Sequence, residues 1–307
     1  MILPDSYGRT LSRLEKVKEW LYSMNITSTG SYFNEIFKTL EHAIIADKSL
    51  KISGHEYLNL RKALNEAFIF INIYDLLRDV NLGADVIGKL KLATRIPDLD
   101  EEDKDSYTCR NHLFELHLAS FLNACNLNVT GYDDVQFEFD GYNFHIECKR
   151  PNSVGKIGRR IGEACDKLKK TYVNSKSRGL IAISADKIVY PHEYLRYKEG
   201  DASVSLETFE MSTADDKAIN GSIDEMTKVF IEKYRDKWNW MPDIRLLGIA
   251  IVYRFMINDR VKDMLLSAFF PAIVPRCDPA TLQGSDRDLL DRLRNHIAFH
   301  GRKRQMV

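Results

Sequence analysis

Hydrophobic residues recur at helical spacing through the first hundred residues of this 307-residue chain. Three stretches, 11–24, 31–47 and 55–79, place apolar residues three and four positions apart, which gives each stretch one apolar face if it is helical. No glycine or proline interrupts the third stretch. The pattern predicts an all-helical N-terminal domain over residues 1–100, in which no residue stands out as catalytic.

The pattern changes close to residue 100. An acidic stretch, 96–106, contains Pro97 and almost no large apolar residue, as is typical of a linker between domains. Beyond it, helical and strand-like patterns follow one another, which predicts an α/β domain over residues 101–307. The expected helices are 110–125, 151–170, 223–238 and 286–300, and the expected strands are 135–139, 142–149, 178–190 and 244–256. The polar stretch 192–222 is expected to be a long connecting loop.

A β-hairpin is predicted where Asp140 and Gly141 separate two alternating runs. Asp-Gly is a strong signal for a two-residue turn, because that turn needs positive φ at both central positions. Side chains alternate along a strand, so Glu147 and Lys149 share one face. Counting outward from the turn, the expected pairs are Phe139–Tyr142, Phe137–Phe144 and Val135–Ile146 on an apolar face, and Glu138–Asn143, Gln136–His145 and Asp134–Glu147 on a polar face.

Two carboxylates, Asp134 and Glu147, are thus expected to face each other across the hairpin. Their Cβ atoms would be about 5 Å apart, and like charges at that distance repel. A divalent cation would offset the repulsion, because Mg²⁺ is commonly held by one or two carboxylates together with water and substrate phosphate. A β-bulge before Val135 would give this role to Asp133 instead. The simpler alternative is that Glu147 and Lys149 form an exposed ion pair at a sheet edge.

These residues resemble the PD-(D/E)XK nuclease superfamily of restriction-endonuclease-like proteins. The resemblance lies in an acid before one strand, Asp134, in Glu147 and Lys149 at the end of the next strand, and in a glutamate on a preceding helix, Glu115. It covers about residues 105–190, in the order helix, strands, helix, strand. The chain departs from the family's name in one respect, because no proline precedes Asp134.

The resemblance implies a mixed central sheet flanked by helices and a metal-dependent nuclease site. Asp134 and Glu147 would hold Mg²⁺ or Mn²⁺ against a phosphate oxygen, and Lys149 would orient or help to deprotonate the attacking water. Glu115 would reach the metal directly or through water. The alternative for Glu115 is a solvent-facing acid on an amphipathic helix.

Basic residues gather directly after the Glu-x-Lys strand and at the start of the following helix. They are Arg150, Lys156, Arg159 and Arg160. A helix N-terminus favours phosphate, so these cations are predicted to hold a nucleic-acid backbone near the metal. The alternative is a solvated, charged face of the helix.

Composition limits the kinds of binding surface, metal site and cellular location that this chain can have. With 44 basic and 44 acidic residues the formal charge is zero, so any nucleic-acid surface must come from local clustering. The five cysteines are scattered singly, which fits neither a disulfide framework nor a zinc knuckle. The N-terminus lacks the pattern of a secretory signal and the longest apolar run, 246–253, is too short to span a bilayer. We therefore expect a cytoplasmic protein without membrane contact.

Two functions are compatible with these observations. The first is a Mg²⁺-dependent endonuclease that hydrolyses phosphodiester bonds in DNA rather than RNA, for which the resemblance implies phage defence or restriction. The alternative is a nuclease-fold subunit that binds nucleic acid or a partner protein and has little activity alone. Neutral charge and a large helical domain suit the alternative. A homodimer would suit the first function, because double-strand cleavage by such folds often needs two active sites.

Overall fold

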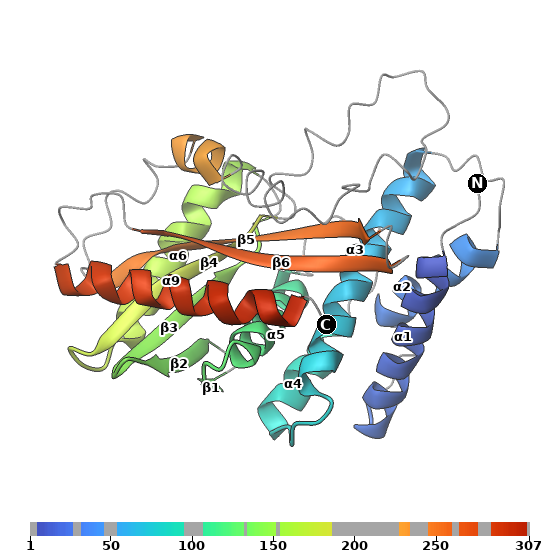
Figure 1. Ribbon diagram of the computed structural model, residues 1–307, viewed down its shortest axis with the longest axis horizontal. Coiled ribbons are helices and arrows are strands. Elements are labelled where there is room, and N and C mark those ends of the chain that lie inside the picture. The colour runs from blue at the N-terminus through green and yellow to red at the C-terminus, as the bar shows by residue number, and fades with distance from the viewer. Residues whose placement is uncertain are drawn as a thin grey trace. The chain divides into compact units, whose positions relative to one another are not determined.

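The fold is described from a computed structural model (Figure 1). The described residues are 5–26, 32–45, 54–94, 107–131, 134–151, 154–185, 227–233, 245–259, 264–275 and 284–305. The predicted linker 96–106 with its domain boundary, the loop 192–222 and Asp133 lie outside them. Within the described ranges, no helix has the length and hydrophobicity needed to cross a membrane.

The chain divides into two compact units. The first comprises Met1–Leu113, His192–Asp215 and Phe255–Ala268, and the second comprises Phe114–Pro191, Asp216–Arg254 and Phe269–Val307. All the candidate site residues belong to the second unit.

Helices make up most of the described residues up to position 94. They are α1 (Asp5–Ser23), α2 (Tyr32–Ile45), α3 (Gly54–Leu77) and α4 (Ala84–Ala93). The first three confirm the helices predicted from hydrophobic spacing, and their apolar faces meet in one core, where Phe33 packs edge-on against Phe70 with ring centroids 5.1 Å apart. The spacing does not predict α4, because ten residues make too short a pattern to stand out.

Most of a mixed six-stranded sheet belongs to the second unit, with its strands in the order β1 to β6. The strands are β1 (Val129–Gly131), β2 (Val135–Phe139), β3 (Tyr142–Lys149), β4 (Ser177–Ser184), β5 (Leu246–Asp259) and β6 (Met264–Pro275). Residues 255–259 of β5 and 264–268 of β6 belong to the first unit. Strands β1 to β3 are antiparallel, whereas β4 runs parallel to β3 and β5 parallel to β4. The α/β class and the four predicted strands are confirmed, while β1 and β6 are strands that the sequence pattern does not predict.

The β2–β3 hairpin has the predicted register. All five pairs within the two strands, from Val135–Ile146 to Phe139–Tyr142, are as counted from the turn. Asp140 and Gly141 have φ values of 53° and 76°, the positive values that a primed two-residue turn requires. Glycine adopts such values without strain, and aspartate tolerates them better than most residues. The local sequence is therefore sufficient to set the register.

Different helices cover the two faces of the sheet. On one face, α5 (Tyr107–Ala124) and α9 (Gly284–Gln305) pack over the apolar side chains of the strands, and Figure 1 shows α9 in red, crossing in front of them. On the other face lies α6 (Ile157–Thr171), which follows a short 3₁₀ turn, Val154–Lys156. The buried stripe of α6 is Ile157, Ile161, Ala164, Cys165 and Leu168.

Ion pairs attach α9 to the sheet. Arg178 of β4 contacts Asp286 of α9 at 2.9 Å, and its guanidinium lies over the ring of Tyr142, 4.6 Å from the centroid. At the turn of the hairpin, close to Tyr142, Arg292 of α9 contacts Asp140 at 2.7 Å. The first of these pairs is almost buried, because its side chains are only 12% and 11% exposed. It fixes the helix against the strands.

Candidate active site

Asp134 and Glu147 converge on one point beside the sheet. Glu147 lies near the end of β3 and is only 3% exposed, and Asp134 directly precedes β2 with a side chain 17% exposed. The confirmed register of the hairpin places the two acids side by side, as predicted. Two carboxylates this close repel each other unless one of them is protonated or a positive charge lies beside them.

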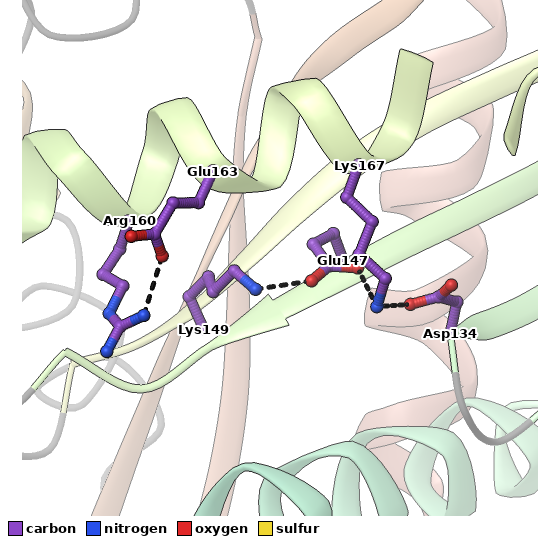
Figure 2. A network of polar contacts seen from close by, with 6 residues as sticks. All are labelled: Asp134, Glu147, Lys149, Arg160, Glu163 and Lys167. Atoms are coloured by element: carbon purple, nitrogen blue, oxygen red, sulfur yellow. Dashed lines mark hydrogen bonds and ion pairs between the residues drawn. The ribbon is translucent and has the colours of Figure 1, made fainter. Parts of the chain in front are cut away.

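The positive charge comes from α6. Nζ of Lys167 lies 2.6 Å from Oδ1 of Asp134 and 3.0 Å from Oε2 of Glu147, so one ammonium bridges the two carboxylates (Figure 2). The head of the lysine reaches the acids from the helix above the strand, while its side chain remains 48% exposed. Lys167 therefore offsets the repulsion between the two carboxylates, a role for which the sequence predicted a divalent cation.

Lys149 supplies a second cation from the same strand face as Glu147. Its Nζ donates a hydrogen bond of 2.5 Å to the other oxygen of Glu147, Oε1. The side chain of Lys149 is 15% exposed. The pair predicted from strand parity is thus present, but it is buried under α6, which excludes the alternative of an exposed pair at a sheet edge.

Burial and charge act against each other on the pKa values of this cluster. Burial is the largest influence on the pKa of Glu147 and raises it, the neighbouring Asp134 carboxyl raises it further, and the contacts with Lys149 and Lys167 oppose the rise. For Lys167, desolvation alone would lower the pKa, but the hydrogen bonds to Asp134 and Glu147 outweigh it and raise the pKa above the ordinary lysine value. Lys167 is therefore firmly held as an ammonium ion.

His145 lies on the same strand face, two residues before Glu147. The imidazole is 8% exposed, and its Nδ1 is buried without a hydrogen-bond partner among the described residues. Desolvation lowers the pKa of His145, and the charge of Asp134 only partly restores it, so the neutral form is favoured. The neutral imidazole, which feels the charge of Asp134, adds a polar group to the strand face that carries Glu147.

Glu115 lies on α5, in the layer that covers the opposite, apolar face of the sheet. The side chain is only 9% exposed, which excludes the alternative of a solvent-facing acid. Since the apolar residues of α5 pack against the face that does not carry Glu147, Glu115 would have to reach the acids around the edge of the sheet. Its role remains a prediction.

The predicted phosphate-binding residues differ in how they are placed. Arg159 and Arg160 both contact Glu163 of α6, at 3.5 and 2.7 Å, and Lys156 is half-buried where the helix begins. Arg150 is only 8% exposed, so its guanidinium offers little surface to a nucleic acid in this conformation. Figure 2 shows that Glu163 and Arg160 lie on α6 at least one helical turn away from Lys167. Only Arg159 is plainly on the surface, and the binding role of all four residues stays a prediction.

Lys167 is the residue of this cluster that the sequence pattern does not single out. It lies beside the apolar stripe of α6, three residues after Ala164 and one before Leu168, on the border between the buried and solvated sides. A lysine at such a border is common, because its long stem packs on apolar surface while its head stays in water. The signal that would have identified it is the combination of this position with an uncompensated pair of acids on the strand below.

In the described part of the chain, no group of three or more histidine, cysteine, aspartate or glutamate side chains is placed to hold a metal ion. Asp134 and Glu147 form a pair, one residue short of such a group. Comparison with known proteins adds no assignment, because no family model, no curated protein and no solved structure matches this chain.

Proposed function

We propose that this protein is a metal-dependent nuclease of the restriction-endonuclease-like type that hydrolyses phosphodiester bonds, in DNA rather than RNA. One observation carries the proposal: carboxylates from the two strands of a hairpin, Asp134 and Glu147, converge on a single cation, and a lysine from the Glu-x-Lys sequence lies against one of them. This arrangement unites the elements that phosphodiester hydrolysis requires, a cation site and a positioned ammonium.

The two acids fit a hard divalent cation. Oxygens of Asp134 and Glu147 lie 2.6 and 3.0 Å from the same cationic nitrogen, so a small shift would bring both to one Mg²⁺ or Mn²⁺. Two carboxylates are a common protein contribution to a Mg²⁺ site, in which water and substrate phosphate provide the other ligands. When bound, the cation would stabilise the negative charge that builds on the phosphate during hydrolysis.

Residues of the protein itself would orient the attacking water, bind the phosphate backbone and exclude bulk water. Lys149, held by Glu147, would orient the attacking water and stabilise developing negative charge with its ammonium. Arg159 on the surface of α6 would hold the phosphate backbone, with Lys156 nearer the start of the helix. Helix α6 would exclude water from the buried carboxylate of Glu147, which strengthens the electrostatic interactions there.

The test is nicking of supercoiled plasmid DNA with Mg²⁺ or Mn²⁺ by the wild type and by two variants, Glu147→Gln and Lys149→Met. We expect each variant to lose about a hundredfold or more in rate. Matched controls are Glu138→Gln, an exposed acid on the same face of the hairpin, and Lys170→Met, an exposed lysine of α6. Both controls should cut as the wild type does.

Two outcomes would count against the proposal. If both site variants cut as fast as the wild type, the assignment of Glu147 and Lys149 is wrong. If the wild type is inert on DNA and RNA with every metal, the alternative of a nuclease-fold subunit that needs a partner gains. One observation favours that alternative: the two acids and two lysines already balance each other's charges.

A further inference from the structure

Lys167 has no part in the reaction proposed above, yet its ammonium lies between the two candidate metal ligands (Figure 2). We propose that Lys167 is an internal counter-ion that competes with a divalent cation for Asp134 and Glu147, so that metal enters this site only when Lys167 leaves it. This inference rests on the metal site of the proposed function, and it adds a control on when that site is filled.

The geometry makes the two occupants exclusive. Lys167 donates to Oδ1 of Asp134 and contacts Oε2 of Glu147, at 2.6 and 3.0 Å. A Mg²⁺ ion bound by both acids would have to approach these oxygens to about 2.0–2.1 Å. An ammonium cannot stay between two oxygens that share such an ion, because the two positive charges would then be in contact in a largely buried place.

The balance of charge leads to the same conclusion. Two carboxylates face two ammonium groups in the described cluster, so its charges cancel while Lys167 is in place. Adding a divalent cation without removing a lysine would leave a large positive excess beside Glu147, which is only 3% exposed. Uncompensated charge in a buried place is costly. Departure of one lysine halves this excess, from two positive charges to one.

Lys167 is the lysine suited to leave. Its side chain is 48% exposed and stands on a helix, so its flexible stem allows the head to turn into solvent with little loss of packing. Lys149 is 15% exposed, is part of the strand, and contacts Glu147 but not Asp134. If the head of Lys167 turned away, both acids would lose their shared cation at once. If Lys149 turned away, Lys167 would still bridge Asp134 and Glu147.

A purely structural role for Lys167 makes a different prediction. If Lys167 only held α6 to the hairpin, removing it would lower stability and leave metal affinity unchanged or weaker. If it competes with metal, removing its charge must raise metal affinity. The two roles are separated by measuring metal binding directly, with the full chain and without nucleic acid.

The experiment is isothermal titration calorimetry with MnCl₂ on the wild type and on Lys167→Met, which keeps the length of the stem and removes the charge. We expect Lys167→Met to bind Mn²⁺ about tenfold more tightly or better, since a charge-assisted contact no longer opposes binding. Lys167→Arg, which keeps the charge, and Lys170→Met, on the exposed side of α6, should bind as the wild type does. Circular dichroism checks that each variant is folded.

The double variant Lys167→Met/Glu147→Gln identifies the site, because it should lose the tight binding. Equal Mn²⁺ affinity in wild type and Lys167→Met would overturn the competition and leave the proposed nuclease untouched. Tight binding that persists in the double variant would also overturn it, because the ion would then lie elsewhere. Absence of any saturable Mn²⁺ binding, in Lys167→Met as well, would remove the metal site and the proposed function with it.

Discussion

On one face of β3, Phe144, Ile146 and Cys148 are buried among the apolar side chains of α5 and α9. On the other face of the same strand, Glu147 and Lys149 lie beneath α6 together with the head of Lys167. Helices cover both faces of β3. The first face carries aliphatic and aromatic side chains, whereas two carboxylates, those of Asp134 and Glu147, and two ammonium groups meet on the second.

The difference shows which side chains of β3 stabilise the fold. Burying apolar surface is favourable at roughly 25 cal/mol per Å², whereas a buried ion pair gains little over well-packed apolar residues of the same size. The charges on the α6 face are thus a poor means of holding the sheet together. Their presence agrees with the proposed function, and separate variants on the two faces test this.

The largest loss of stability is expected from Phe144→Ala on the apolar face. Phe144 is 0% exposed and stacks on Phe137 with ring centroids 5.1 Å apart. Its truncation should lower the free energy of unfolding by about 3–5 kcal/mol. Urea unfolding followed by circular dichroism measures the loss, and Asn143→Ala, an exposed neighbour, is the control. A loss below about 1 kcal/mol would mean that this face is not the stabilising one.

A charge pair on the apolar side should behave as a structural clamp. Asp286→Ala leaves Arg178 almost buried without its carboxylate, and we expect a loss of about 3 kcal/mol. Asp288→Ala, at an exposed position of the same helix, should change stability by less than about 0.5 kcal/mol. Thermal and urea unfolding compare the two. If they are equal, α9 is not held by this pair.

A glycine within the sheet and a glycine on α6 are expected to differ in their tolerance of one added methyl group. A Cβ on Gly248 of β5 would lie 2.2 Å from the backbone oxygen of Val274, so Gly248→Ala should cost about 1–3 kcal/mol. On α6, nothing lies within 4 Å of a Cβ on Gly162, and Gly162→Ala should gain about 0.5–1 kcal/mol, because alanine favours the helix. A loss of stability at Gly162 would show that this position of α6 does not have room for a methyl group.

The smallest change in stability is expected from Glu147→Gln. Burial raises the pKa of Glu147, which means that the folded protein disfavours its charged form, and removing the charge relieves that cost while two lysine contacts weaken. The opposing effects should leave the free energy of unfolding within about 1 kcal/mol of the wild type. Urea unfolding measures it beside the nicking assay. A loss as large as that of Phe144→Ala would make Glu147 a structural residue.

The hairpin and the neighbourhood of its two acids could be predicted because their determinants are local. The Asp-Gly turn requires positive φ at two adjacent residues, and strand alternation then assigns every side chain to a face. Asp134 lies beside Glu147 for that reason alone. By contrast, the sequence pattern does not reveal β6 or α4. The long apolar run of β6 hides its alternation, and α4 is too short to show a helical period.

The sequence by itself therefore determined the register of the β2–β3 hairpin, the shared face of Glu147 and Lys149, and the convergence of Asp134 on Glu147. Tertiary structure alone decided what neutralises those acids. Lys167 is 20 residues beyond Glu147 in the chain and on a different element, and it reaches the carboxylates only because the stripe from Ile157 to Leu168 sets where α6 crosses the sheet. Packing between distant segments, which no local period encodes, placed a lysine where the sequence had predicted a metal ion.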